Sequence, residues 1–485
     1  MPVEEKKSPG LDLEAASLSE DKPPVNALHV ERAELLANLP DPDADKTPEE
    51  RAVIDRKLMW KVDVALIPWL SLLYLMSFLD RTNIGNARLA GMEDDLGMKG
   101  QDYNMTLTIF FISYAAAEPV TNALLKRLSP RVFFTAIIFV WGVTQTLMGI
   151  VHNYPGLLAA RFFLGIAEAG LFPGVNYYLS CWYKSSEIGV RSAIFFSAAA
   201  LAGSFGGIAT VLVGIGCWWM VFDWPEDARF LSADDRIRMQ RRLIADRQGR
   251  TAEDFDKRHI WAALRDWKTY GYMFIYSGAL VPLYAFSLFL PTILKGMGHV
   301  GTRAQLLSVP PYAVAAALTV IVGFVADATK YRGYCNAATV LVGISGFVML
   351  LASQNPQVQY AGTFLGAAGI YPTISNTLSW VINNTEGSLK RAVVLGMVVG
   401  FGNLNGVVSS NIYLTREAPR FWTGHGVVLG YQVVALLGGT VVMHAALRKM
   451  NRDRTAGRMD AKWAAMGEEE RWAMGDIRPD FKYTL

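Results

Sequence analysis

Long apolar runs follow one another along most of the chain, and short polar or charged stretches separate them. Each run approaches or exceeds the roughly 20 apolar residues that an α-helix needs to cross a bilayer. Eleven such runs occur, at residues 62–82, 104–125, 132–151, 157–180, 192–222, 270–294, 311–328, 335–353, 358–382, 392–413 and 425–447. The pattern predicts an all-α polytopic membrane protein that crosses the bilayer many times.

Two long polar segments interrupt this pattern. The first 60 residues hold 14 acidic and 8 basic residues and are rich in proline and serine, which is typical of a disordered tail. Residues 223–268 carry eleven Lys/Arg and ten Asp/Glu and divide the apolar runs into two groups. We therefore expect a disordered N-terminal tail, an N-terminal membrane half, a central loop, a C-terminal membrane half and a C-terminal tail, over 1–60, 61–222, 223–268, 269–447 and 448–485.

The basic residues of the short loops predict the orientation. They gather in alternate loops, at Lys126, Arg127 and Arg131, at Lys184 and Arg191, at Lys330 and Arg332, and at Lys390 and Arg391. The central loop and the C-terminal tail are basic as well. Because cytoplasmic loops carry an excess of Lys and Arg, we expect both termini and the central loop in the cytoplasm. Each half must then cross the membrane an even number of times.

The fifth run conflicts with that requirement. Its 31 residues, 192–222, would form about 46 Å of helix, longer than the ~30 Å hydrocarbon core and too short for two full crossings. Two alternatives fit this length. The run crosses once and inverts the second half, or it bends at Gly203, Gly206, Gly207 or Gly214 into two short helices.

Composition excludes several classes of function. Of the 485 residues 52% are hydrophobic and only 18% are charged, below the roughly 25% of soluble domains. A net charge of +3 over this length gives no basic patch for nucleic acid. The three cysteines share no spacing typical of a metal site or a disulfide framework. Motifs of serine hydrolases, zinc proteases and phosphate-binding loops do not occur, so we expect no enzyme and no metal centre.

Charged residues inside the predicted spans indicate the chemistry, because each costs about 2.5–3.5 kcal/mol at a helix centre. Asp80 and Arg81 end the first run, and Arg161 and Glu168 lie seven residues apart on one face of the fourth. Arginine binds carboxylates bidentately, and a partly desolvated carboxylate exchanges protons, so these groups suit a proton-coupled anion site. The alternative is structural, with Arg161 and Glu168 each pairing within the bundle. For Asp63 and Glu118 a structural role is expected.

A glycine-rich stretch at residues 400–406 adds two candidate hydrogen-bond donors. It lies within an apolar run and follows no strand, so it predicts close helix packing rather than a dinucleotide loop. Asn403 and Asn405 in this stretch are candidates for contact with a substrate.

Three segments carry a resemblance to a known family. Residues 80–86 (DRTNIGN), 161–174 (RFFLGIAEAGLFPG) and 323–333 (GFVADATKYRG) resemble the major facilitator superfamily, and specifically its anion:cation symporter branch with the fungal allantoate and nicotinate permeases. The resemblance runs from about Trp60 to the C-terminus. It implies a fold of two six-helix halves that alternate access to a site near the membrane midplane.

The resemblance also implies roles for individual residues. Asp80 and Glu168 would couple transport to protons, and Arg81 and Arg161 would bind the carboxylate of the substrate. A second group, Gly323, Asp327 and Arg332, matches the gating loop on the cytoplasmic side. The proton gradient would supply the energy, and no cofactor would be required.

One region departs from the family pattern. Residues 197–207 resemble the fifth span of the family and residues 213–225 the end of its sixth, but the outer ends and the joining loop are missing. About 25 residues are absent near Ile208, given a span of ~20 residues and a loop. The fifth and sixth spans are therefore expected to be shortened or fused, for 11–12 spans in total.

Together these observations predict a monomeric transporter of the plasma membrane that imports a small organic anion such as nicotinate or allantoate with protons. One alternative is an exporter of an acidic fungal metabolite on the same fold. Another is a protein that does not transport, or a misspliced product, because of the segment missing near Ile208.

Overall fold

The structure is a computed structural model, and it describes residues 39–184, 187–200, 207–245, 257–298, 302–386, 388–418, 420–457, 476 and 481–485. Across these ranges the regular structure is helical and contains no strand, which confirms the predicted all-α class. The elements before the second polar segment are α2 (Pro48–Leu89), α3 (Met92–Asp95), α4 (Asp102–Arg127), α5 (Pro130–Met148), α6 (Tyr154–Glu168), α7 (Leu171–Ser180), α8 (Ile188–Ala200) and α9 (Gly207–Met220).

The remaining elements complete the second half. The polar segment contains the 3₁₀ turn η1 (Pro225–Asp227), α10 (Ala233–Ala245) and α11 (Lys257–Arg265). The elements that follow are α12 (Trp267–Gly296), α13 (Thr302–Thr329), α14 (Arg332–Ala352), α15 (Pro356–Asn383), α16 (Ser388–Leu404), α17 (Gly406–Asn411), η2 (Thr415–Glu417), α18 (Trp422–Gly430), the π-helical η3 (Tyr431–Gly438) and α19 (Gly439–Thr455).

Every predicted apolar run coincides with one of these helices or with a consecutive pair. Eight helical stretches of the described chain are long and apolar enough to cross a membrane: α2, α5, α6 with α7, α12, α13, α14, α16 with α17, and α18 through α19. Helices α4 and α15 have the length but carry more polar residues, many of which are buried inside the bundle. Helices α8 and α9 are too short individually.

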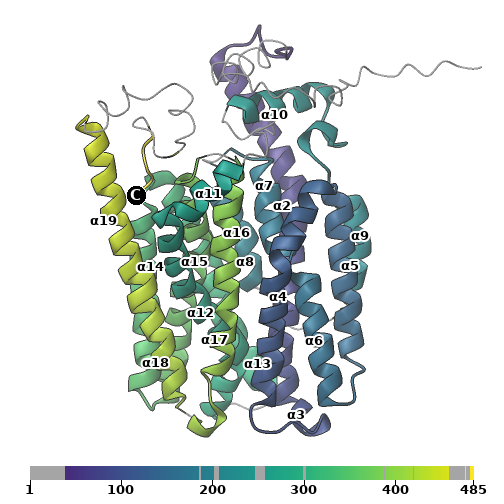
Figure 1. Ribbon diagram of the computed structural model, residues 1–485, viewed down its shortest axis with the longest axis vertical. Coiled ribbons are helices and arrows are strands. Elements are labelled where there is room, and N and C mark those ends of the chain that lie inside the picture. Colours follow the sequence, from purple (N-terminus) through teal and green to yellow (C-terminus); the bar gives the residue numbers. More distant parts are fainter. Residues whose placement is uncertain are drawn as a thin grey trace, which may run out of the picture.

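The helices form two groups that lie side by side (Figure 1). Helices α2 to α9 make one group and α12 to α19 the other, and α8 packs against α13 and α15 where the groups meet. The start of α2, helices α10 and α11, and the C-terminus all lie at the same end of the bundle (Figure 1). Each half therefore begins and ends at one end, as the loop charges require.

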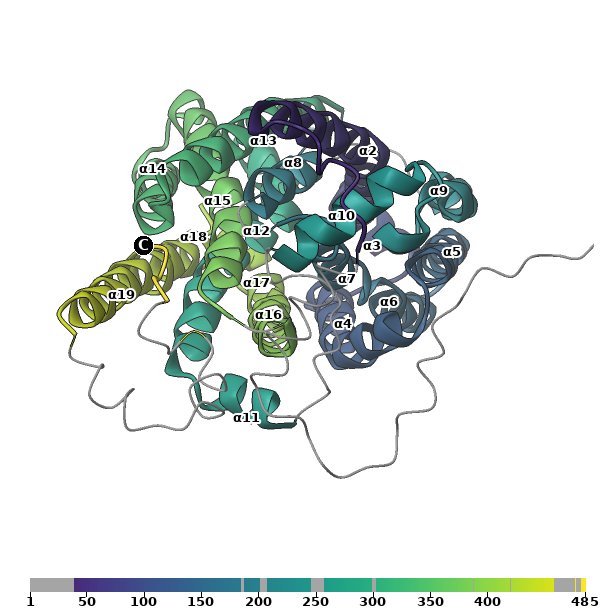
Figure 2. The same cartoon turned by 90° about the horizontal axis from the view of Figure 1, so that it is seen from above.

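The fifth apolar run is two helices and not one. Helix α8 packs against α2, α13 and α15, whereas α9 packs along α5 at the edge of the bundle (Figure 2). The bend falls between Ala200 and Gly207, and two of the predicted bend positions, Gly203 and Gly206, lie outside the described residues. Gly214 is wrong as a bend, since it lies inside α9. Each helix is about 20 Å long at 1.5 Å per residue.

The N-terminal tail is shorter than predicted. Helix α2 begins at Pro48, so residues 48–60 are helical and not disordered, while residues 1–38 lie outside the described part. Ahead of α2, the carboxylate of Asp43 accepts two hydrogen bonds from Arg238 on α10, at 2.7 and 2.9 Å. These bonds lower the pKa of Asp43 to about 2. The ion pair therefore ties the polar segment to the start of the first span.

The C-terminal residues dock onto the same end of the second half. The carboxylate of Asp476 is fully buried and pairs with Lys268 of α12 and Lys390 of α16, each at 2.5 Å. The backbone of Thr484 bonds to the side chain of Asn384 in both directions, at 2.7 and 2.9 Å. The tail thus supplies the counter-ion for two lysines that are about 5% exposed.

We predict that Asp476→Ala destabilises the folded protein by about 3–5 kcal/mol, because removing one member of a buried ion pair leaves uncompensated charge. Lys268 and Lys390 keep only Asp266, at 3.2 and 2.8 Å. Thermal unfolding of the purified protein in detergent measures the effect. Asp94→Ala, at an exposed position, serves as the control and should leave the melting temperature unchanged. Equal melting temperatures for the two variants would contradict the structural role of Asp476.

Candidate functional site

A buried ion pair between α2 and α6 lies at the centre of the candidate site. Nη2 of Arg81 is 2.7 Å from Oε1 of Glu168, and the two side chains are 8% and 0% exposed. The hydroxyl of Ser77, one turn before Arg81 on α2, donates to the same carboxylate oxygen. Glu168 is therefore held by Arg81 and Ser77, and not by Arg161 on its own helix.

The ion pair continues as a line of hydrogen bonds into the second half of the protein. Nη1 of Arg81 donates to the hydroxyl of Tyr284 on α12 at 3.3 Å, and that hydroxyl donates to Oδ1 of Asn403 on α16 at 2.6 Å. The amide of Asn403 then donates to Oε2 of Glu118 on α4 at 3.2 Å. We call Ser77, Glu168, Arg81, Tyr284, Asn403 and Glu118 the central polar chain. It starts and ends in the first half and passes through the second.

Aromatic rings surround the guanidinium of Arg81. Its Cζ atom lies 5.2 to 5.8 Å from the ring centroids of Phe78, Phe110, Tyr114 and Tyr284. Such contacts stabilise a cation and keep water away from it. In this setting, electrostatic interactions are stronger than in water.

Arg161 is the second cation of the site, and it is differently placed. Its side chain is 2% exposed, and its Nε and Nη2 atoms have no hydrogen-bond partner within the described chain. Arg161, Arg81, Tyr284 and Ser287 all line one cavity of about 10 Å³, enough for about one water molecule. A buried guanidinium with unused donors is suited to bind an anion.

The other predicted site residues divide into two groups. Asn403 belongs to the central polar chain. Asn405 donates to the carbonyl of Phe401 in its own helix, at 2.7 Å, and so bonds away from the chain. Asp80 is 1% exposed and precedes Arg81 on α2, but it is not among the residues that line the cavity. The structure thus brings together Arg81, Arg161, Glu168 and Asn403.

The predicted gating residues meet at the boundary between the halves. Asp327, near the end of α13, forms an ion pair with Arg332 at the start of α14. Its other oxygen accepts a hydrogen bond at 2.8 Å from the backbone N–H of Val190, in the first turn of α8. A Cβ atom on Gly323 would lie 2.6 Å from Cβ of Ala193, so α13 and α8 are in close contact. A carboxylate at a helix N-terminus is electrostatically favourable. We call this cluster the latch.

The two halves also touch at the other end of the bundle. The side-chain amide of Asn411 on α17 donates to the hydroxyl of Thr108 on α4, at 2.9 Å. A Cβ atom on Gly85 would lie 3.0 Å from the carbonyl oxygen of Leu288. With the latch formed, these contacts at the far end and a cavity of about 10 Å³, the structure is a closed conformation.

Sequence reasoning missed two members of the central polar chain and misjudged a third. Tyr284 and Ser77 carry no charge, and only charged residues within apolar runs were treated as signals. In α12, Ser277, Tyr284 and Ser287 recur at spacings of seven and three, which places them on one helix face and could have identified the lining. Glu118, for which a purely structural role was expected, is the terminal acceptor of the chain.

Comparison with known proteins agrees with this architecture. A family model described as Major Facilitator Superfamily matches residues 70–439. The chain is 32% identical over 473 residues to the MFS-type transporter cnsO of Penicillium expansum, covering 89% of this chain and 90% of that protein. It is 29% identical over 506 residues to the high-affinity nicotinic acid transporter of Saccharomyces cerevisiae, covering 98% and 92%.

A solved structure shares the fold. The human organic anion transporter MFSD10 (TETRAN) superposes with a TM-score of 0.54 at 11% identity, covering 78% of this chain and 99% of that one. The predicted resemblance is confirmed, and the relatives are transporters and not enzymes. The chain belongs to the major facilitator superfamily of membrane transporters.

Proposed function

We propose that the chain is a proton-coupled symporter that imports a small organic anion across the plasma membrane by alternating access. It acts as a monomer with both termini in the cytoplasm. The observation that carries the proposal is the pair of buried arginines on one cavity. Arg81 is bound to Glu168, while Arg161 keeps unused donors.

The two arginines suggest how substrate and proton are linked. A substrate carboxylate binds first to Arg161, whose donors are unused, and then competes with Glu168 for Arg81. When Glu168 loses Arg81, a buried carboxylate is left without its counter-ion, which is costly. Taking up a proton removes that cost. Binding of the anion and protonation of Glu168 therefore favour each other, as symport requires.

The central polar chain suggests how the site reports to both halves. Tyr284 and Asn403 belong to the second half, and they join Arg81 to Glu118 of the first. If Arg81 moves towards a substrate, its bond to Tyr284 at 3.3 Å is the weakest link and breaks first. The halves are then free to move relative to each other around the site.

The substrate class follows from the lining. Arg161 and Arg81 select a carboxylate, and Phe110, Phe111 and Tyr284 around the cavity offer aromatic faces. The name of the yeast relative, a nicotinic acid transporter, agrees with a small aromatic carboxylate. Nicotinate and allantoate are therefore the first substrates to test.

Transport itself is the first test. Cells that express the chain should accumulate labelled nicotinate or allantoate, and a protonophore should abolish the accumulation because it removes the driving force. Uptake that survives the protonophore would exclude proton coupling. If a panel of small carboxylates gives no movement in either direction, the chain does not transport them.

Arg161→Ala should weaken binding of the carboxylate substrate by at least about thirtyfold, since losing one partner of a buried charge pair costs about 2–5 kcal/mol. Arg161→Lys should restore part of the affinity because it keeps the charge without the bidentate fork. Equilibrium binding to purified protein measures both. Arg303→Ala, at an exposed position, should bind as the unmodified protein does. Unchanged affinity in Arg161→Ala would remove Arg161 from the site.

Asp327→Asn should open the latch more often, because the ion pair with Arg332 is lost. The experiment uses protein whose Cys181, Cys217 and Cys335 are replaced by alanine and which carries Ala193→Cys, a position 1% exposed. We expect a thiol reagent to label this cysteine several-fold faster with Asp327→Asn than without it. A cysteine at Thr108, at the opposite end, should label no faster. Equal increases at both positions would indicate general loosening instead of a gate.

A further inference from the structure

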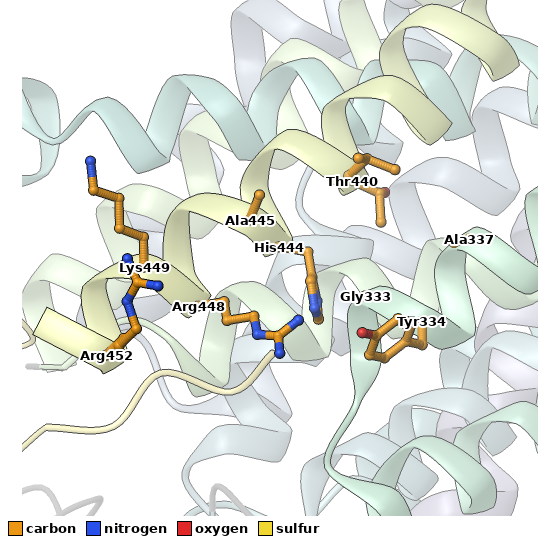
Figure 3. A pocket seen from close by; sticks show the side chains of 10 residues that line it. Gly333, Tyr334, Ala337, Thr440, His444, Ala445, Arg448, Lys449 and Arg452 are labelled. Carbon is orange, nitrogen blue, oxygen red and sulfur yellow. The ribbon is translucent and has the colours of Figure 1, made fainter. Parts of the chain in front are cut away.

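A groove between α14 and α19 lies away from the central polar chain. It has a volume of about 620 Å³ and is lined only by residues of these two helices (Figure 3). Helices α14 and α19 lie at the periphery of the bundle (Figure 2), so the groove belongs to an outer surface. None of its residues belongs to the site, the latch or the docked C-terminal residues.

One part of the groove is strongly basic. Arg448, Lys449 and Arg452 follow one another within about one turn of α19, and all three are exposed. They form no ion pair with any described residue. Figure 3 shows Arg448 reaching towards His444 and the ring of Tyr334. Three uncompensated cations in one groove form a ready binding site for an anion.

The rest of the groove is apolar. Ala337 of α14 and Val441 and Ala445 of α19 line it, and all belong to the apolar runs predicted to cross the membrane. The three cations stand immediately beyond the end of the last run, at residue 447. Along one groove the lining thus changes from hydrocarbon to positive charge at the membrane boundary. Its occupant must change in the same way, from an apolar chain to an anionic head.

The wall opposite the cations is well built. The rings of Tyr334 and His444 pack with centroids 4.5 Å apart. A Cβ atom on Gly333 would lie 2.9 Å from Nδ1 of His444, so glycine is needed for this contact. The backbone N–H of Gly333 donates to the carbonyl of Leu485 at 3.2 Å, which joins the wall to the docked C-terminal residues.

We infer that this groove binds an anionic phospholipid. The phosphate and any further negative groups of the head contact Arg448, Lys449 and Arg452, and an acyl chain lies along Ala337, Val441 and Ala445. Basic pockets between helices at a membrane face are suited to such headgroups. Because the wall is joined to the C-terminal residues, an occupied groove holds α14, α19 and this segment together.

The test compares the purified full-length protein in nanodiscs of phosphatidylcholine alone with nanodiscs that also contain phosphatidylserine. The anionic lipid should raise the melting temperature, and it should remain bound in native mass spectrometry. For Arg448→Ala/Arg452→Ala, the affinity for phosphatidylserine should fall by about tenfold or more. Arg56→Ala/Lys57→Ala removes the same charge from exposed positions near the start of α2 and should bind as the unmodified protein does.

Two further arms distinguish a lipid site from a site for soluble anions and from general attraction of the basic surface to the membrane. Ala445→Trp fills the groove at an exposed position and keeps every charge, so it should also lower the affinity by several-fold. Glycerophosphoserine, which has the headgroup but no acyl chains, should neither bind measurably nor stabilise the protein. The inference is overturned if the soluble headgroup binds as tightly as the lipid, or if the two double variants lose affinity equally. None of these outcomes depends on the transported substrate.

Discussion

The ion pair between Arg81 and Glu168 constrains the rest of the structure. Both side chains lie inside a bilayer-spanning bundle, where a single uncompensated charge costs several kcal/mol. The pair cannot simply dissociate, so either a proton or another anion must replace the lost partner. Ser77, Tyr284 and the ring of aromatic side chains around Arg81 satisfy and shield the pair. A transport cycle built on this site must therefore proceed by exchange of partners.

The contacts that close the two ends differ in kind, and this difference matters for opening. Around Gly85 and Gly406 the halves meet through a backbone carbonyl and an aromatic ring, which separate without leaving a buried charge. At the latch, Asp327 accepts the N–H of Val190 and pairs with Arg332. When that end opens, Arg332 still holds the carboxylate within the second half. The latch can thus lose its bond across the boundary while its charge stays compensated.

The sequence predicted the helices well because the bilayer imposes a simple rule of length and hydrophobicity. It located the buried charges for the same reason. It did not predict which charges pair, because Glu168 and Arg161 share a helix face and only the position of α2 decides that Arg81 reaches Glu168. Nor could it predict that Tyr284 and Asn403, 119 residues apart, form a hydrogen bond. Such contacts depend on how the two halves pack.

The short fifth run is the feature that weighs most against a working transporter, and its position decides how much it matters. The central polar chain uses α2, α4, α6, α12 and α16, and the latch uses α8, α13 and α14. Helix α9 contributes no residue to either of them, and α8 contributes its first turns, at the end where the latch forms. Shortening the far end of α8 and the start of α9 therefore spares the charged site and one gate. The arrangement of these residues favours a transporter with a reduced outer wall over a protein that has lost its mechanism.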